Sequence, residues 1–307
     1  MRVDQENAIT ADLIAVLVAV SGNRPRTLTV KDGNALPSGP FEADHRSLQS
    51  GLRARVERQT GHVLGYIEQL YTFADRDRAG DAQHRVISIS YLGLTREGRD
   101  AGATSSWRDW YDYFPWEDHR DGRPPFFDDR IAVPLLTWAR DGATAGLREE
   151  RTQRVNISFG LSGLAWHEEL VLQRYELLYE AGLVPSTGPA SGSAALVPGK
   201  SMLADHRRIL ATGIGRLRAK IKYRPVVFEL LAPTFTLLQL QRCVEALAGQ
   251  RIHKQNFRRL IEQQELVEET GAVTSDTIGR PAKLFRFRQA VLAERVAVGT
   301  KIPLARG

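Results

Sequence analysis

The order of helix signals in residues 223–275 restricts the fold more than any other feature of the chain. Pro225 suits the first turn of a short helix. Thr236 and Gln239, three residues apart, form the capping box that begins a second helix, and Gly249 is placed to end it. A third helix follows after a turn of three residues. Two helices joined by so short a turn, with another helix before them, predict a helix-turn-helix.

The predicted third helix, His253–Gln264, has an apolar edge and a polar face. Phe257, Leu260 and Ile261 recur at the spacing of residues that share one side of a helix. The other positions carry side chains that can read base edges in the major groove of DNA. The residues of this helix predicted to contact DNA are His253, Lys254, Gln255, Asn256, Arg258 and Arg259.

A β-ribbon is predicted after this helix, as in the wing of a winged helix-turn-helix domain. Leu266–Val267 and Leu284–Phe287 flank a loop that contains glycines. Arg280 and Lys283 are predicted to contact phosphate or the minor groove from this ribbon.

Charge is divided unevenly along the chain. Residues 1–200 carry 23 Lys and Arg against 27 Asp and Glu, whereas residues 201–307 carry 19 against 9. The last third therefore has a net charge of +10, and the rest has −4. Such a division predicts a nucleic-acid-binding module attached to another domain. A winged helix used for protein contacts is the alternative, and the basic charge argues against it.

Residues 36–61, LPSGPFEADHRSLQSGLRARVERQTG, predict a turn, a helix and a second turn. The stretch resembles the Nudix box, which holds magnesium against a nucleoside diphosphate. Leu36, Pro37, Gly39, Thr60 and Gly61 keep the frame of that box. The acidic helix that supplies the metal ligands in the family is replaced here by a basic one.

Two registers relate this helix to the metal-binding slots of the family. Anchoring on Thr60 and Gly61 places Arg55, Arg58 and Gln59 in the carboxylate slots. Anchoring on Gly39 instead places Glu57 in one slot and His45 at the upstream glutamate position. Magnesium prefers oxygen ligands, chiefly carboxylates and phosphates. In either register the helix lacks the carboxylate cluster, so the sequence predicts no metal, no catalytic residue and no resident cofactor.

Arginines in these positions could pair directly with phosphate oxygens, because guanidinium is a forked donor. The alternative is an ordinary amphipathic helix with a solvated basic face. The aromatic stretch 107–123 could bury against a sheet or form a wall for an adenine ring. The residues predicted to bind a nucleotide are Arg53, Arg55, Arg58, Tyr71, Arg76, Arg78 and Trp116.

The segments around the box predict a sheet. Strands are expected at Asp12–Val20 and Thr27–Val30 before it, with a turn at residues 23–25, and at Tyr66–Phe73 and Arg85–Thr95 after it. A hairpin loop is expected at residues 75–83. Further strands are expected at 131–139 and 155–159, and an amphipathic helix at 163–182. The order predicts an α/β/α sandwich.

The chain is therefore predicted to be an α+β protein, with a Nudix-like α/β/α sandwich followed by a winged helix-turn-helix domain. Residues 185–199 are rich in Pro, Gly, Ser and Ala, which indicates a linker. A basic helix at 205–222 could bridge the two halves. The predicted division is residues 1–184 for nucleotide sensing, 185–221 for linker and bridging helix, and 222–295 for DNA binding.

Two absences in the sequence limit the class of protein. The single cysteine, Cys243, excludes an internal disulfide and a cysteine-rich zinc site. The apolar run Leu13–Val20 is too short to span a bilayer and lacks the basic flank of a signal peptide. A cytoplasmic location without membrane attachment is expected.

Taken together, the two halves resemble the NrtR-type transcriptional regulators of NAD metabolism. The resemblance extends over nearly the whole chain. It rests on LPSG…QTG, EQLYTFADRDR, RVISISYL, RYELLYEAGLV, KYRPVVFELL, FTLLQLQ, HKQNFRRL and GRPAKLFRF.

The resemblance implies a homodimeric repressor that binds palindromic operators of NAD biosynthesis or salvage genes. It also implies an adenine nucleotide effector in the N-terminal domain, namely ADP-ribose, NAD or ATP. Two other functions remain open. One is an active Nudix hydrolase of ADP-ribose or a related diphosphate, with a metal site built from Glu57 and Asp75 or Asp77. The other is a nucleotide-binding scaffold whose winged helix binds protein.

Overall fold

The computed structural model describes residues 9–74, 85–97, 105–184, 197–274, 281–288 and 290. Their core is a mixed six-stranded sheet with the strand order β4-β5-β1-β2-β6, in which β3 also pairs with β1. β1 is parallel to β5 and antiparallel to β2 and β3. The strands are β1 (Ile9–Ser21), β2 (Arg24–Val30), β3 (Ser38–Pro40), β4 (Tyr66–Phe73), β5 (Arg85–Leu94) and β6 (Ser105–Asp109).

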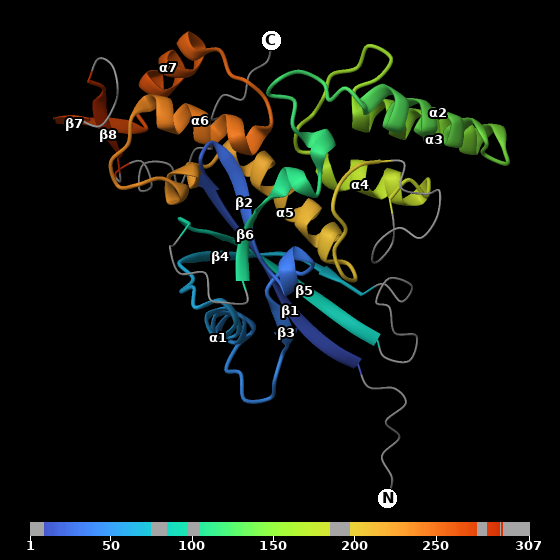
Figure 1. The fold of residues 1–307 in the computed structure, drawn as a ribbon, viewed down its shortest axis with the longest axis horizontal. Coiled ribbons are helices and arrows are strands. Elements are labelled where there is room, and N and C mark those ends of the chain that lie inside the picture. The colour runs from blue at the N-terminus through green and yellow to red at the C-terminus, as the bar shows by residue number, and fades with distance from the viewer. Residues whose placement is uncertain are drawn as a thin grey trace, which may run out of the picture.

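The central strand β1 is buried on both faces because its alternate residues enter two separate cores. Leu13, Ala15, Leu17 and Ala19 pack with Leu52 and Val56 of helix α1 (Leu48–Thr60). Ile14, Val16 and Val18 belong to the other core, which includes residues of helix α5 (His206–Ile221). Figure 1 shows α1 on one side of the sheet and α5 on the other. The predicted α/β/α sandwich is confirmed.

Helix α5 begins and ends within a residue of the predicted basic helix 205–222. It packs against β1, β4 and β5, and also contacts the helices α4 and α6. α5 is therefore a layer of the sandwich as well as a connection to the C-terminal helices. The division of the chain at residues 184 and 221 remains a prediction.

The strands predicted at 131–139 and 155–159 are wrong, because both segments are helical. The first lies in η6 (Asp128–Ala132) and α2 (Val133–Arg140), which has a proline in its first turn. The second is the end of α3 (Ala145–Phe159), which begins at the side-chain cap of Thr144. Val155 and Phe159 are both buried, and their separation of four residues fits one helix face. Both windows contain β-branched residues, which are common in strands, so local composition alone does not distinguish a strand from a helix here.

Two other boundaries also differ from the prediction. The helix expected at 163–182 is shorter, at α4 (Val171–Glu180), since residues 162–163 and 168–170 are turns. The turn expected at 23–25 lies at residues 22–23, and Arg24 already belongs to β2. The hairpin loop expected at 75–83 lies outside the described residues. Short helical turns occur at η2 (Lys31–Gly33), η4 (Trp110–Asp112) and η5 (Pro115–Glu117).

The C-terminal region has the predicted order of three helices and a ribbon. The elements are η7 (Val226–Leu230), α6 (Leu237–Ala248), α7 (Lys254–Gln263), β7 (Val267–Val273) and β8 (Lys283–Phe287). The capping box of Thr236 and Gln239 is present, and Gly249 ends α6 in the left-handed conformation. This region and the α2–α3 pair lie toward opposite ends of the layer that contains α5 (Figure 1). Within the described parts of the chain, the helices are too short or too polar to cross a membrane.

Candidate nucleic-acid interface and nucleotide site

Helix α7 presents its polar face to solvent. Phe257 and Ile261 are buried on its inner side, as predicted. The six residues of 253–259 predicted to contact DNA are all exposed: His253, Lys254, Gln255, Asn256, Arg258 and Arg259. Among the described residues, no ion pair involves the two arginines. The geometry therefore makes these cations available to an anionic partner, and the individual DNA contacts remain predictions.

The wing is attached to the helices by its strands. Phe235, which precedes α6, forms a two-bond backbone bridge with Phe285 of β8, with distances of 2.9 and 2.8 Å. Phe228 of η7 stacks on Phe287 at a centroid distance of 4.4 Å. Lys283, predicted to contact phosphate, pairs instead with the exposed Glu269 at 2.9 Å. Such exposed pairs contribute little, so phosphate could compete for this ammonium. Arg280 lies outside the described residues.

The Nudix-like stretch places Arg55 against the loop that precedes α1. The guanidinium of Arg55 packs against Gly39, where a Cβ atom would lie 2.3 Å from its Nε atom, so a larger residue would make the arginine shift. The guanidinium also pairs with Glu42 at 3.1 Å. Burial raises the pKa of the nearby Asp12, and the charge of Arg55 opposes that shift. The guanidinium of Arg55 thus interacts with two carboxylates, Glu42 of the box loop and Asp12 of β1.

The side chains of Gln59 and Arg53 form hydrogen bonds with backbone groups next to α1. The amide of Gln59 donates to the carbonyl of Ser38 at 2.8 Å and accepts from its N–H at 3.1 Å. Arg53 donates to the carbonyls of Leu64 and, at 2.8 Å, Gly65, in the segment that follows the C-terminal end of the helix. Residues two apart in a helix differ by about 200° around its axis, so Arg53 and Arg55 lie on opposite sides of α1. The two arginines therefore do not form one face, and nucleotide binding by Arg53, Arg55 and Arg58 stays a prediction.

The other predicted nucleotide-binding residues are scattered. Arg58 and Tyr71 are exposed, whereas Arg76 and Arg78 lie outside the described residues. Trp116 is fully buried, with its ring packed edge-on against Phe114 at 5.7 Å. The indole offers no surface to a ligand, so the proposed adenine wall is corrected to a core residue.

The described residues do not fit the magnesium site of a Nudix hydrolase. Glu42, Asp44 and His45 could each offer one ligand atom, and these atoms lie within 4.8 Å of one another. However, Glu42 pairs with Arg55, and Nδ1 of His45 accepts the Glu42 N–H at 3.0 Å. Magnesium needs several free oxygen ligands in octahedral geometry. The cluster of Glu42, Asp44 and His45, next to the guanidinium of Arg55, does not offer enough free oxygen ligands for magnesium.

The first residues of the box are tied to the start of α5. The Leu36 N–H donates to Nδ1 of His206 at 2.9 Å, and the Leu203 N–H donates to the Asn34 carbonyl at 2.8 Å. Burial lowers the pKa of His206 to about 4, which keeps its imidazole neutral and able to accept this bond. α5 has 16 residues, so it extends about 24 Å from the box toward the winged helix.

A buried charge network, which the sequence did not reveal, lies near the other end of α5. Glu117 accepts from Nε of Arg174 at 2.6 Å and from Nη1 of Arg218 at 2.5 Å, and all three side chains are fully buried. Burial raises the pKa of Glu117, but the two guanidiniums lower it more. One signal was available in the sequence: Arg174 occurs among the leucines of an amphipathic helix, where a solvated arginine is not expected.

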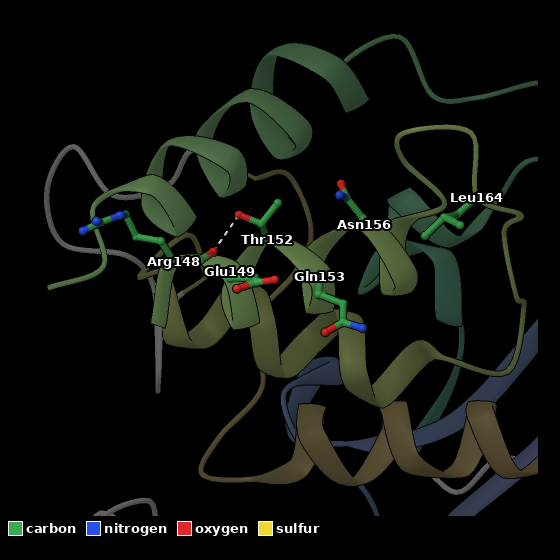
Figure 2. A pocket seen from close by; sticks show the side chains of 6 residues that line it. All are labelled: Arg148, Glu149, Thr152, Gln153, Asn156 and Leu164. Atoms are coloured by element: carbon green, nitrogen blue, oxygen red, sulfur yellow. Dashed lines mark hydrogen bonds between the residues drawn. The ribbon is translucent and has the colours of Figure 1, made fainter. Parts of the chain in front are cut away.

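A shallow hollow of about 480 Å³ lies on the outer side of α3. Figure 2 shows its lining, with the Thr152 hydroxyl bonded to the Arg148 carbonyl at 2.7 Å. None of the predicted site residues lines it. It is distant from both the box and α7 along the chain and in the fold.

Comparison with known proteins decides what the C-terminal region is. A family model described as the NrtR DNA-binding winged helix domain matches residues 227–287. Residues 227–287 therefore match an NrtR-type DNA-binding winged helix domain. The matched span contains α7 and the ribbon, so the exposed cations of Arg258 and Arg259 lie within the matched domain.

The chain is also similar to individual relatives. The "ADPR responsive transcriptional repressor NtrR" of Acinetobacter baylyi is 38% identical over 84 residues, or 27% of this chain. The match spans 33% of that relative's length. The crystal structure of Shewanella oneidensis NrtR complexed with a 27mer DNA superposes with a TM-score of 0.54 at 20% identity. The aligned part covers 91% of this chain and 93% of that one.

A second structure supports the same fold. It is the crystal structure of a MutT/nudix family protein from Enterococcus faecalis, with a TM-score of 0.52 at 15% identity. It covers 94% of this chain and 90% of that one. The sandwich and the winged helix together therefore have the fold of NrtR. The fold implied by the sequence resemblance is confirmed.

Proposed function

We propose that this chain is a ligand-responsive transcriptional repressor that binds double-stranded DNA through α7 and the wing. The observation that carries the proposal is the exposed basic face of α7 within an NrtR winged-helix domain. Arginine and lysine on such a helix can reach phosphates and base edges of the major groove. The protein would act as a homodimer on a palindromic operator, because the two-fold axis of a dimer matches the two-fold axis of a palindrome. The proposed location is the cytoplasm.

The effector proposed for the sandwich is an adenine nucleotide of the NAD family: ADP-ribose, NAD or ATP. ADP-ribose has support from the printed name of the Acinetobacter relative. We also propose that the genes under the control of this protein are those of NAD biosynthesis or salvage. Of the predicted residues that the structure describes, Arg58 and Tyr71 are exposed and Arg53 and Arg55 are partly exposed, so these four retain accessible surface for this role.

Phosphate binding at Arg55 offers a physical trigger. The guanidinium pairs with Glu42, whose side chain is partly exposed, so a phosphate could replace that carboxylate. Displacement of Glu42 would change the box loop, which is bonded to the start of α5 through Leu36. α5 contacts α6 of the winged helix, and this helix would transmit the change to the DNA-binding surface.

The chain is proposed to have no hydrolase activity. The slots that hold glutamates in the active family contain Arg55, Arg58 and Gln59 in one register, and Gln59 is bonded to β3 through Ser38. In the other register Glu57 is a single exposed carboxylate. Neither arrangement supplies a carboxylate cluster for magnesium.

One experiment separates the repressor from the hydrolase. The full chain is mixed with DNA from upstream of its own gene and of NAD genes, and binding is followed by mobility shift. The same protein is incubated with ADP-ribose and magnesium or manganese. A retarded complex that weakens with salt, without release of AMP, is expected. Turnover near one per second, at the low end of ordinary enzymes, would overturn the assignment in favour of the hydrolase.

A further inference from the structure

The C-terminal carbonyls of α6 are bonded to groups from outside the winged helix. The last carbonyls of a helix have no partner within it. Here the Ala246 carbonyl accepts from the Tyr111 hydroxyl at 2.7 Å, and the Leu247 carbonyl accepts from Nε of Arg218 at 2.8 Å. Tyr111 belongs to the segment after β6, and Arg218 to α5. Side chains of the sandwich thus donate the hydrogen bonds that the last carbonyls of α6 cannot form within the helix.

The turn after α6 is in direct backbone contact with the same groups. The Gly249 carbonyl accepts from the His119 N–H at 2.7 Å. Gly249 has a φ of +72°, and a Cβ atom there would lie 2.3 Å from the Glu117 carbonyl oxygen. The same Cβ would lie 2.9 Å from both Nη2 of Arg218 and the Tyr111 hydroxyl. Only glycine permits this approach of two backbones.

The other side of the turn is fixed from within the winged helix. The buried Glu245 carboxylate accepts from the Ile252 N–H at 3.0 Å and from the Gln241 amide at 2.9 Å. The Gln241 amide also donates to the Ile252 carbonyl at 2.9 Å. α7 begins at Lys254, two residues beyond this bond. The direction of α7 therefore depends on how the turn is held.

We infer that Tyr111, His119 and Arg218 form a seat that orients the DNA-recognition helix against the sandwich. Arg218 is in turn held by Glu117, whose carboxylate it contacts at 2.5 Å in the core. The inference rests on the proposed DNA-binding function. In a two-fold dimer, the orientation of α7 in each protomer sets the spacing of the two recognition helices. These residues are positioning residues, since they act on DNA through the turn.

Gly249→Ala tests the seat. Gly182→Ala is its matched control, because Gly182 has a similar φ of +68° with no atom within 4 Å of its added Cβ. Both variants carry the backbone strain of a left-handed alanine, but only Gly249→Ala collides with the sandwich. Operator affinity is measured on the natural site and on one with its half-sites one base pair further apart. Amide exchange at His119 reports the contact without DNA.

Gly249→Ala should lose about tenfold in operator affinity, equivalent to one good base contact. It should also discriminate less between the two spacings and exchange the His119 amide faster, while Gly182→Ala stays like the wild type. If Gly249→Ala does not fold, Tyr111→Phe, which removes one hydroxyl, should show the same changes more weakly.

Two results would overturn the seat. One is unchanged His119 exchange in the seat variant, which would mean that the contact is not held in solution. The other is faster exchange with wild-type affinity and spacing preference, which would mean that the contact does not orient α7. If the wild type binds no operator, the proposed function fails, and the His119 exchange alone then decides whether the seat holds the turn.

Discussion

Replacement of Arg258 and Arg259 together by alanine is expected to remove most of the specific DNA affinity of this protein. Both side chains are exposed on the outer face of α7, away from the buried Phe257 and Ile261. Each arginine that reads a base edge contributes about 1–3 kcal/mol of discrimination. If a side chain contacts phosphate instead, its loss should reduce the slope of log affinity against log salt by about one.

The measurement is operator binding by fluorescence anisotropy over a series of salt concentrations. Arg140→Ala is a suitable control, because Arg140 is an exposed arginine at the end of α2, on the far side of the molecule from α7. It removes one positive charge without touching the winged helix. If the double variant and this control bind the operator with equal affinity at every salt concentration, α7 does not contact DNA.

Glu117→Gln is expected to lower the free energy of unfolding by about 3–5 kcal/mol, the usual effect of removing one partner of a buried ion pair. Arg174 and Arg218 would remain fully buried beside a neutral amide. That loss is a large part of the total stability of an ordinary domain, which is about 5–15 kcal/mol. Chemical denaturation of the full chain measures it, with Glu180→Gln as the control. Glu180 pairs with Arg154 on the surface, where such pairs contribute about 0–1 kcal/mol.

The same carboxylate predicts a dependence of stability on pH. The pKa of Glu117 in the folded protein lies below its ordinary value of 4.5, so folding favours the ionised form. Its contribution is therefore present above pH 4.5 and is lost as pH falls through the folded pKa. Glu117→Gln should flatten this acid limb of the stability curve. Equal unfolding free energies for the Glu117 and Glu180 variants would show that the buried network contributes no more to stability than a surface ion pair.

The C-terminal helices and ribbon could be predicted from sequence because their signals are local. The capping box of Thr236 and Gln239, the stop at Gly249 and the apolar edge of α7 lie within a few residues of one another. Each places one element without reference to the rest of the fold. The alternate burial of β1 is similar, since a continuous apolar run already indicates a strand covered on both sides.

The errors came from segments whose environment is set by distant residues. The window Val155–Phe159 suits a strand by composition, but it is the end of a helix that begins ten residues earlier. Trp116 could be a ligand wall or a core residue, and only packing against Phe114 and the layers around it decides between them. Arg53 and Arg55 are two residues apart, yet they bond to separate segments of the chain, Leu64–Gly65 and Glu42, which the sequence does not pair with either arginine.

The seat of the winged helix could not be seen in sequence for the same reason. Glu117 and Arg218 are 101 residues apart, and Tyr111 and Ala246 are 135 apart. No spacing rule links such residues. Only the fold brings the segment after β6, the end of α5 and the end of α6 to one place.

A nucleotide bound by the sandwich is expected to control DNA binding by the winged helix. The direct measurement is operator affinity of the full chain with and without saturating ADP-ribose, at fixed salt. A change of 5- to 150-fold, in either direction, is expected, since this is about the usual range of allosteric coupling. Identical affinities, with ADP-ribose shown by calorimetry to be bound, would contradict control of DNA binding by the nucleotide.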